Sequence, residues 1–263
     1  MMDEFVSIED RAKAIFGDRA DYYVTSVAHS DAQMLQHLVA LVNPQPTWRV
    51  LDVATGTGHT ALAFAPYVHE IVGVDLTPRM LQEAEKLAAV QGITNIRFVE
   101  ADIHELPFDD ETFDDEQFDL ITCRRAAHHF SDIKEALFEM VRMLKPQGVL
   151  LIDDRSVPED DLVDSLMNRL DWLHDESHVR EYRASEWQAM LDALDCRVTV
   201  LEPYVQSRPL TSLTDRVAAQ NVAQIQGILN SLSSQQREKL GIVEAEGGIF
   251  SNHWYITLVA QKK

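Results

Sequence analysis

Short apolar runs alternate with amphipathic helical patterns between residues 31 and 155, and this alternation restricts the fold more than any other feature of the chain. The runs that predict strands are residues 48–54, 70–76, 95–102, 118–124 and 149–154. The patterns that predict helices are residues 31–42, 59–67, 78–92 and 131–148. Because helices separate most of these strands, we expect a parallel sheet with helices packed on it.

The alternation weakens after residue 155. Helical patterns cover residues 158–174, 185–194 and about 211–240, and two further strands are predicted at residues 196–204 and 253–261. The chain has 263 residues, and no linker rich in glycine, serine or proline divides it into two halves. We therefore expect one compact unit of seven strands.

The formal net charge of −20 bears on the partners that the protein can bind. Most of such a surface repels nucleic acid and anionic membranes, so we expect neither as a partner. Residues 107–117 belong to the most acidic stretch and predict a solvated loop. A solvated acidic surface is the simpler explanation of the charge, which by itself indicates no ligand.

Cysteine content and the amino terminus bear on the cellular compartment. Cys123 and Cys196 are the only cysteines, too few for a disulfide framework or a thiolate zinc site. The first ten residues are acidic where a secretory signal would be basic, and no apolar run approaches the roughly 20 residues of a membrane span. We therefore expect a cytoplasmic protein.

The loop after the first predicted strand is rich in glycine and threonine, with the sequence RVLDVATGTGHTA at residues 49–61. Gly56 and Gly58, together with Ala61, fit the G-x-G-x-x-A pattern that places a pyrophosphate at a helix N-terminus. A tight turn without a ligand is the simpler alternative, because glycine readily adopts the positive φ values that turns require. The pattern alone leaves both alternatives open.

Two acidic residues flank this loop. Asp52 lies near the end of the first strand, and its carboxylate would repel a pyrophosphate by about 4 kcal/mol at ~4 Å and an effective dielectric of about 20. The same charge attracts a ligand that carries ammonium and sulfonium groups. Asp75 ends the second strand, where an acid can accept both ribose hydroxyls of a nucleoside or can merely cap the next helix.

Five motifs in sequence order resemble those of class I S-adenosylmethionine-dependent methyltransferases. These motifs are VLDVATGTGHTA, VGVDLTPRML, VEADIHELPF, FDLITCRRAAHHF and VRMLKPQGVLLIDD. The resemblance is closest to the ubiquinone/menaquinone C-methyltransferase-like group, methyltransferase type 11, and it covers about residues 15–195. It implies S-adenosyl-L-methionine as the cofactor.

The resemblance implies an α/β fold. The expected sheet is Rossmann-like, mostly parallel and seven-stranded, with helices on both faces, an antiparallel last strand and helical lid elements. We expect a single methyltransferase domain over residues 1–263. Within it, residues 1–45 would form an N-terminal helical cap, residues 46–155 the cofactor-binding core, and residues 156–263 the substrate lid and the C-terminal strands.

Cofactor-binding roles are also implied by the resemblance. The glycine loop and Asp52 would surround the methionine part, Asp75 the ribose, and Asp102 the adenine amino group. Ala54 stands where the wider family most often has glycine. The full set of expected cofactor-binding residues is Tyr23, Asp52, Ala54, Gly56, Gly58, Asp75, Leu76, Met80, Asp102, Ile103 and Arg124.

An aromatic residue of the N-terminal helix covers bound cofactor in this family, and Tyr22 or Tyr23 could take that place here. A helix that only packs Phe16, Tyr23 and Val27 on the core explains the sequence as well.

Methyl transfer mainly requires that the acceptor nucleophile is positioned, and a base is needed only for a poorly acidic hydroxyl or carbon acid. His128 and His129 follow the fourth predicted strand, at the carboxyl end of the sheet where ligands bind in open α/β folds. Either is a candidate catalytic base, and a histidine that only lines the pocket is the alternative. We expect a small-molecule acceptor, and O-, N- and C-methylation all remain open.

Asp153, Asp154 and Arg155 end the fifth strand and are expected to face the same pocket. Paired carboxylates can hold magnesium, but adjacent residues on a strand point to opposite sides and no third ligand is evident. We therefore expect no metal site.

Residues 168–187 follow the fifth strand and combine polar with aromatic side chains, which suits a lid over a small substrate. An amphipathic helix with Leu170, Leu173 and Trp187 turned inward is the alternative.

Two other functions fit parts of the sequence. An NAD(P)-dependent oxidoreductase would use the same loop for a dinucleotide, although Asp52 and the pair Asp102–Ile103 argue against it. A non-catalytic S-adenosylmethionine-binding protein would keep the cofactor site without turnover. The sequence does not indicate an oligomeric state.

Overall fold

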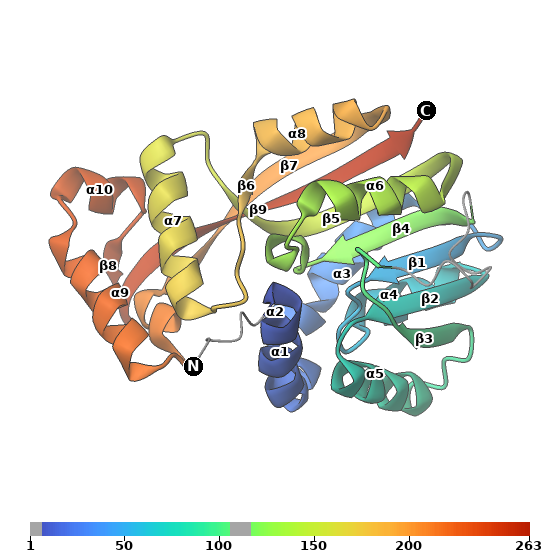
Figure 1. Cartoon of the computed structure of the whole chain (residues 1–263), viewed down its shortest axis with the longest axis horizontal. Helices are drawn as coiled ribbons and strands as arrows, with labels where there is room; N and C mark the ends of the chain where they lie inside the picture. Colours follow the sequence, from blue (N-terminus) through green and yellow to red (C-terminus); the bar gives the residue numbers. More distant parts are fainter. Residues whose placement is uncertain (1–6, 106–116) are drawn as a thin grey trace, which may run out of the picture.

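Five parallel strands form one half of the central sheet in the computed structural model, which describes residues 7–105 and 117–263. The main path of the sheet has the order β3-β2-β1-β4-β5-β9-β7, and two short strands pair at its side (Figure 1). The parallel strands are β1 (Arg49–Val53), β2 (Glu70–Asp75), β3 (Ile96–Glu100), β4 (Phe118–Arg124) and β5 (Leu144–Val157). The predicted Rossmann-like α/β fold is confirmed.

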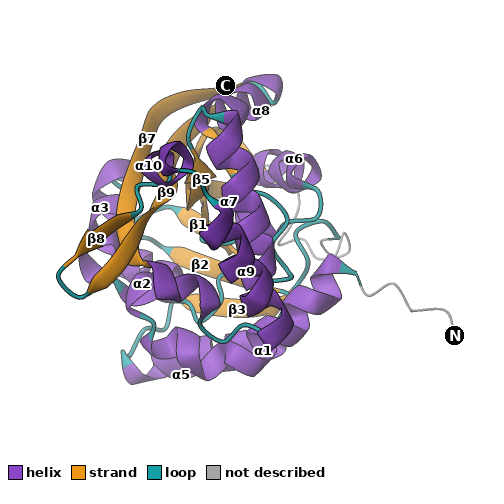
Figure 2. Ribbon diagram, turned by 90° about the vertical axis from the view of Figure 1, so that its left-hand side faces the viewer, coloured by secondary structure: helices purple, strands orange, loops and turns teal. Residues whose placement is uncertain are grey.

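Helices cover both faces of this sheet because side chains along each strand alternate between the two faces. Val50 and Leu120 pack on one face with α3 and α4, whereas Leu51 and Ile121 pack on the other face with α6 and α8 (Figure 2). The helices that cover the sheet are α3 (Ala32–Val42), α4 (His59–Phe64), α5 (Pro78–Val90), α6 (Ile133–Met143) and α8 (Ala184–Ala193). Of these, α5 lies beside β2 and β3.

The other half of the sheet is a long antiparallel pair. β9 (Gly248–Lys262) runs antiparallel to β5 on one side and to β7 (Cys196–Pro209) on the other. Both strands are longer than predicted, because their outer ends continue as a ribbon beyond the parallel strands. The short strands β6 (Tyr182–Arg183) and β8 (Val243–Ala245), which the sequence did not indicate, pair with β5 and β9.

A second helical layer lies beyond the carboxyl ends of the parallel strands and has its own apolar core. It consists of α7 (Asp161–His174), η4 (Leu210–Thr214), α9 (Ala219–Ser231) and α10 (Ser234–Lys239). Leu170 and Leu173 of α7 are buried, and so is Trp187 of α8. The inward packing that was the alternative to a lid is therefore present for these three residues.

The N-terminal helix α1 (Ile8–Thr25) lies in front of the carboxyl ends of the strands and packs against α5 (Figure 1). It begins at Ser7, whose hydroxyl accepts the backbone N–H of Asp10 at 3.0 Å. Short helical turns complete the chain, namely α2 (Val27–Ser30), η1 (Ala65–Tyr67) and η3 (Ala127–His129). Of the predicted acidic loop, residues 107–116 lie outside the described residues.

Within residues 7–105 and 117–263, no helix has the length and apolar character that a membrane crossing needs.

The turn from β1 into α4 has a tightly constrained backbone. Ala54, Gly56 and Gly58 all have positive φ values, of 51°, 54° and 84°. A Cβ atom at Gly58 would lie 3.1 Å from the Cβ of Ala84 on α5, whereas one at Gly56 would have no neighbour within 4 Å. Gly58 is therefore required for packing, and Gly56 leaves space open in front of the loop.

A comparison of Gly58 with Gly92 predicts how much an alanine costs at each position. Gly92 also has a positive φ, of 67°, but has open space around it. Gly92→Ala should cost only the left-handed strain, roughly 1–2 kcal/mol of unfolding free energy. Gly58→Ala should cost about 1–3 kcal/mol more, because the new methyl group collides with Ala84. Urea unfolding measures both values, and equal losses would show that the contact with Ala84 does not constrain the turn.

Candidate active site

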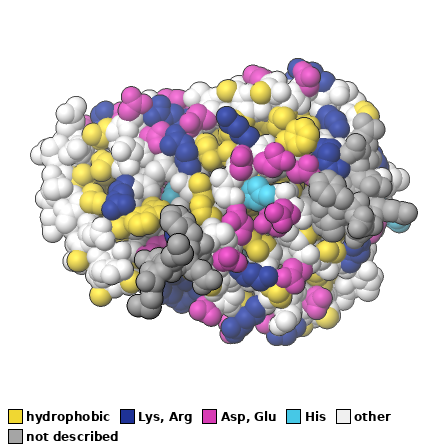
Figure 3. Space-filling view, in the orientation of Figure 1, with side chains coloured by type: hydrophobic (Ala, Val, Ile, Leu, Met, Phe, Trp, Pro, Cys, Tyr) yellow, Lys and Arg dark blue, Asp and Glu magenta, His cyan; other side chains and the backbone are white. Residues whose placement is uncertain are grey.

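A crevice of about 1050 Å³ lies at the carboxyl ends of β1, β2 and β4, and α1 forms its outer wall. β1 lies between β2 and β4, so the connections from these strands run in opposite directions along the sheet at this place. Ligands of open α/β sheets bind at such a switch point. Figure 3 shows acidic side chains gathered around a histidine near the middle of this face.

Asp75, at the end of β2, holds the glycine loop in place. Its Oδ2 accepts the backbone N–H of Gly56 at 2.8 Å, and its Oδ1 accepts that of Thr77 at 2.8 Å. The carboxylate also lines the crevice. Burial raises its pKa above the usual value, and the two amide hydrogen bonds oppose this shift.

Asp52 is almost completely buried at the floor of the crevice, with 1% of its surface exposed. It lies opposite Thr122 in the pairing of β1 with β4, and the Thr122 hydroxyl donates to Asp52 Oδ1 at 2.5 Å. The Thr55 hydroxyl donates to Oδ2 at 2.6 Å. Burial raises the pKa of Asp52 to about 6, and these two hydrogen bonds limit the rise.

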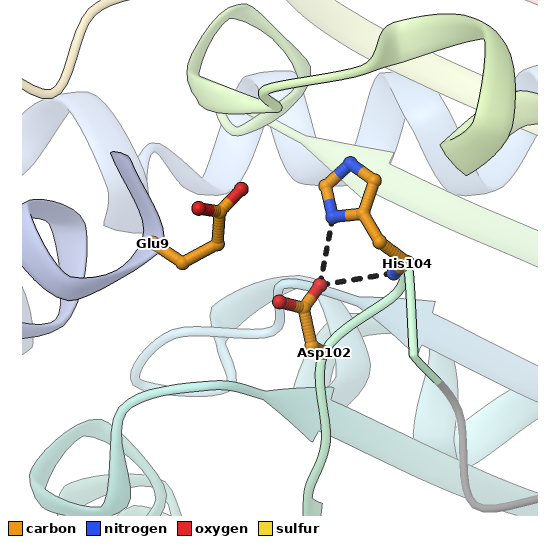
Figure 4. Close-up of side chains that lie close together, drawn as sticks. All are labelled: Glu9, Asp102 and His104. Carbon is orange, nitrogen blue, oxygen red and sulfur yellow. Dashed lines mark hydrogen bonds and ion pairs between the residues drawn. The ribbon is translucent and has the colours of Figure 1, made fainter. Parts of the chain in front are cut away.

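Three residues meet at the end of the crevice beyond β3 (Figure 4). Asp102 Oδ1 accepts the backbone N–H of His104 at 2.9 Å and bonds with its Nδ1 at 2.8 Å. Burial disfavours the charged form of His104, but the Asp102 carboxylate outweighs it and raises the pKa of this histidine. Burial would raise the pKa of Asp102, but hydrogen bonds from His104 outweigh it and lower that pKa. Glu9 of α1 comes close enough that one ligand atom from each residue lies within 4.8 Å of the others. The trio could hold a cation.

Of the two candidate tyrosines on α1, Tyr23 lies in the outer wall of the crevice, together with Phe16. It lines the crevice and packs edge-on against Phe16 at 5.9 Å, whereas Tyr22 is 46% exposed and lies outside the crevice. Burial and the carboxylate of Asp175 raise the pKa of Tyr23 to about 12, so its hydroxyl stays protonated. The choice between the two tyrosines thus falls on Tyr23.

Arg124 and Arg125 end β4 and line the crevice on the side away from Asp102. Both guanidinium groups lie near Asp153 Oδ2, with Nε–O distances of 3.3 Å and 3.2 Å. The expectation that Asp153 faces the crevice is wrong. Its Oδ1 instead accepts the hydroxyl groups of Tyr204 at 2.8 Å and Thr257 at 3.0 Å, in the interior of the sheet.

Asp154 points to the opposite side of β5, as alternation along a strand requires. Its Oδ1 bonds with Nδ1 of His128 at 2.6 Å, and its Oδ2 accepts the His128 backbone N–H at 2.9 Å. The expectation that Asp154 and Arg155 face the crevice is also wrong. Arg155 forms buried ion pairs with Asp171 of α7 and with Glu181, which directly precedes β6.

The two neighbouring histidines occupy different places. His129 lines the crevice and packs edge-on against Phe16 at 5.0 Å. Its Nδ1 lies 3.1 Å from both the carbonyl and the hydroxyl oxygen of Ser177, and burial lowers its pKa to about 4. His128 lies behind it, with 4.1 Å between ring centroids, and does not line the crevice.

Most of the predicted cofactor-binding residues thus lie around one crevice, and Gly58 is the exception. Those that line it are Tyr23, Asp52, Ala54, Gly56, Asp75, Leu76, Met80, Asp102, Ile103 and Arg124. Sequence reasoning missed Glu9, His104 and Arg125. The spacing of Asp102 and His104 and the doublet Arg124–Arg125 were visible signals, whereas nothing in the sequence indicates that Glu9 lies there.

Comparison with known proteins agrees with this arrangement. A family model described as a methyltransferase domain matches residues 45–200. A Bacillus subtilis protein named "Uncharacterized methyltransferase YcgJ" is 43% identical over 178 residues, which are 68% of this chain and 68% of that protein. The chain belongs to the S-adenosylmethionine-dependent methyltransferases. The family resemblance and the expected cofactor, S-adenosyl-L-methionine, are thereby confirmed.

The crystal structure of the same Bacillus protein supports the fold, and a second relative supports the narrower group. The crystal structure of YcgJ superposes with a TM-score of 0.79 at 37% identity, covering 87% of this chain and 97% of that one. A demethylmenaquinone methyltransferase of Deinococcus radiodurans is 43% identical over 107 residues. That match covers 40% of this methyltransferase and 42% of the Deinococcus protein.

The raised pKa of Asp52 predicts how cofactor affinity depends on pH. A cationic ligand requires the ionised carboxylate, so affinity for S-adenosylmethionine should fall below pH about 6, by up to tenfold per unit. Thr122→Val removes a hydrogen bond that lowers this pKa, so the fall should begin at a higher pH. Thr122→Ser keeps the hydroxyl and serves as the control. Calorimetric titration between pH 5 and 8 tests this, and the same midpoint in all three proteins would contradict it.

Proposed function

We propose that this methyltransferase methylates a small molecule bound at the carboxyl end of β4, next to the cofactor crevice. The observation that carries the proposal is the pair of carboxylates, Asp52 and Asp75, on either side of a glycine loop that is open in front of Gly56. Negative charge at this place suits a cationic nucleoside and does not suit the pyrophosphate of a dinucleotide.

The residues present fit S-adenosylmethionine. Each oxygen of Asp75 accepts one backbone N–H and has a second lone pair, so the same carboxylate can accept two ribose hydroxyls. Asp52 lies where it can attract the cationic methionine part. The trio of Glu9, Asp102 and His104 lies at the remaining end, where carboxylate oxygens can accept hydrogen bonds from the adenine amino group. We therefore assign the trio to the nucleoside and not to a metal.

The bound cofactor supplies a methyl group on a positively charged sulfur, which is open to attack by a nucleophile. The protein has to hold the acceptor in line and exclude water, which can account for a large part of the rate increase. Helix α1, with Phe16 and Tyr23 turned inward, covers the crevice and limits access of water.

Among the residues that the structure describes, neither of the two predicted catalytic histidines has both a place in the crevice and a carboxylate partner. His129 lines the crevice, but a pKa of about 4 makes it a weak proton acceptor near neutral pH. Nδ1 of His128 lies 2.6 Å from Asp154 Oδ1, and this histidine does not line the crevice. We propose that His129 is the histidine that meets and positions the acceptor, and that His128 packs behind it without contact to the acceptor.

A binding experiment tests the cofactor assignment. S-adenosylhomocysteine should bind the wild-type protein and raise its melting temperature, and NAD should do neither. Asp75→Ala should weaken the binding by about 10- to 100-fold, because hydrogen bonds to a charged group are lost. Asp119→Ala is the matched control, since Asp119 accepts the backbone N–H of Arg49 at 2.8 Å but lies at the opposite end of β4. Equal binding by both variants would refute the assignment.

The histidines are tested with any phenol, quinone or amine that the enzyme methylates. His129→Asn should raise KM for the acceptor, because this ring lines the crevice. His128→Asn should raise it less, because His128 does not line the crevice. Affinity for S-adenosylhomocysteine should stay unchanged in both variants. An unchanged KM in His129→Asn would remove its positioning role, and no S-adenosylhomocysteine from any acceptor would favour a non-catalytic binding protein.

A further inference from the structure

We propose that the acceptor carries an anionic group, a carboxylate or a phosphate, and that Arg124, Arg125 and Arg208 bind this group. The inference rests on the proposed function, because it assigns the acceptor site of the same enzyme. Its basis is a second, open hollow between α3, the end of β4 and the outer part of β7.

The hollow adjoins the cofactor crevice. Arg124 and Arg125 line both spaces, so they form the wall between them. Arg208, together with Gln206 and Ser207 of β7, lines only the hollow. An acceptor held by these arginines therefore lies next to the cofactor crevice.

Positive charge exceeds negative charge among the described residues that line this hollow, which include three arginines and one acidic residue. Asp153 lies near both Arg124 and Arg125, so one carboxylate is shared by two guanidinium groups. Within the described part of the chain, Arg208 forms no ion pair, and its Nη2 donates to the side-chain oxygen of Gln206 at 3.1 Å. The carboxylate that lines the hollow is Asp31, which is exposed and caps α3 through the N–H groups of Gln33 and Met34.

Arg125 is held rigidly for such a role. Its φ of 56° lies in the left-handed region, which residues other than glycine rarely adopt, and its N–H donates to the carbonyl of Asp153 at 2.8 Å. The guanidinium stacks on the ring of Tyr255 at 3.8 Å, and its Nη2 donates to the hydroxyl of Tyr204 at 2.8 Å. A guanidinium fixed in this way loses little conformational freedom when it binds an anion.

Burial and the arginines lower the pKa values of two groups near the hollow, whereas Asp153 and Asp154 raise the pKa of Arg125 against the effect of burial. Burial and then the charges of Arg124 and Arg125 lower the pKa of His29 to about 3, so the histidine remains neutral. Burial and the neighbouring cations Arg155 and Arg125 lower the pKa of Arg208 as well. An oxyanion would reduce the repulsion, and arginine binds carboxylate and phosphate groups through paired hydrogen bonds. A site of this charge is notable in a chain whose formal net charge is −20.

The test is binding of simple anions to the protein saturated with S-adenosylhomocysteine, at constant ionic strength set with sodium chloride. The probes are inorganic phosphate, benzoate and benzamide, the last being the neutral counterpart of benzoate. At least one anion should bind with a Kd on the order of millimolar, and benzamide should not bind. The anion that binds more tightly identifies the group as phosphate or carboxylate.

Substitution of Arg208 makes the test specific, because Arg208 does not line the cofactor crevice. Arg208→Gln should weaken anion binding by about tenfold or more and leave affinity for S-adenosylhomocysteine unchanged. Arg208→Lys should retain part of the binding. Arg197→Gln is the matched control, since Arg197 lies on the same strand, is exposed and bonds only to Gln261 among the described residues.

Two results would overturn the inference. One is equal binding of benzoate and benzamide, and the other is anion binding that is the same in the wild-type protein and in Arg208→Gln. Loss of S-adenosylhomocysteine binding itself would instead count against the proposed function, so the two failures can be told apart.

Discussion

A buried carboxylate at the boundary between two strands is the constraint on which the active site depends. Asp52 lies at the switch point of the sheet, where β1 contacts β4, and hydroxyl groups of Thr122 and Thr55 hydrogen-bond to its two oxygens. A buried charge without such donors would cost several kcal/mol. The same hydrogen bonds connect β1, β4 and the glycine loop, so the carboxylate at the floor of the crevice also fixes the surrounding backbone.

The loop around this carboxylate combines strain with open space. Ala54 has a φ of 51°, in the left-handed region where glycine is the least strained residue. Gly58 packs against α5, and Asp75 holds the amide of Gly56. The result is a rigid rim with no side chain in front of Gly56, which allows a ligand to approach the backbone closely.

Opposite charges occupy neighbouring parts of the site. Carboxylates of Asp52, Asp75 and Asp102 line the cofactor crevice, whereas arginines line the adjoining hollow. Asp153 and Tyr204 lie in the interior behind the arginines and hold them at the wall between the two spaces. This separation favours two different ligands, because a cationic ligand and an anionic ligand each meet charge of the opposite sign.

Local pattern predicted the order of the five parallel strands, but β5 begins at Leu144, inside the predicted helix 131–148. Buried strands such as β1 and β2 have continuous apolar runs, and their turns contain the residues that such turns require. The boundaries of β7 and β9 were predicted too short, and β6 and β8 were missed. Those strands are stabilised by pairing with segments far along the chain, as in the register of Cys196 with Lys262, and local sequence contains little information about such pairing.

The site was predicted in the same uneven way. Asp52, Asp75 and Asp102 could be placed because each follows or ends a recognisable strand of the parallel sheet. Glu9 could not, since it reaches the crevice only through the packing of α1 across the sheet. Asp153 and Asp154 were expected in the crevice, but a strand covered on both faces directs one to Arg124 and Arg125 and the other to His128.

The sequence by itself determined the strand and helix order, the glycine turn and the acidic strand ends, because these depend on neighbours within a few residues. Only the tertiary structure decided that His129 lines the crevice while His128 pairs with Asp154 behind it. It also decided that Arg208 lies beside Arg124, although 84 residues separate them in the chain. These contacts depend on where the antiparallel pair β7 and β9 lies relative to the end of β4. The packing of segments far apart in the chain sets that geometry.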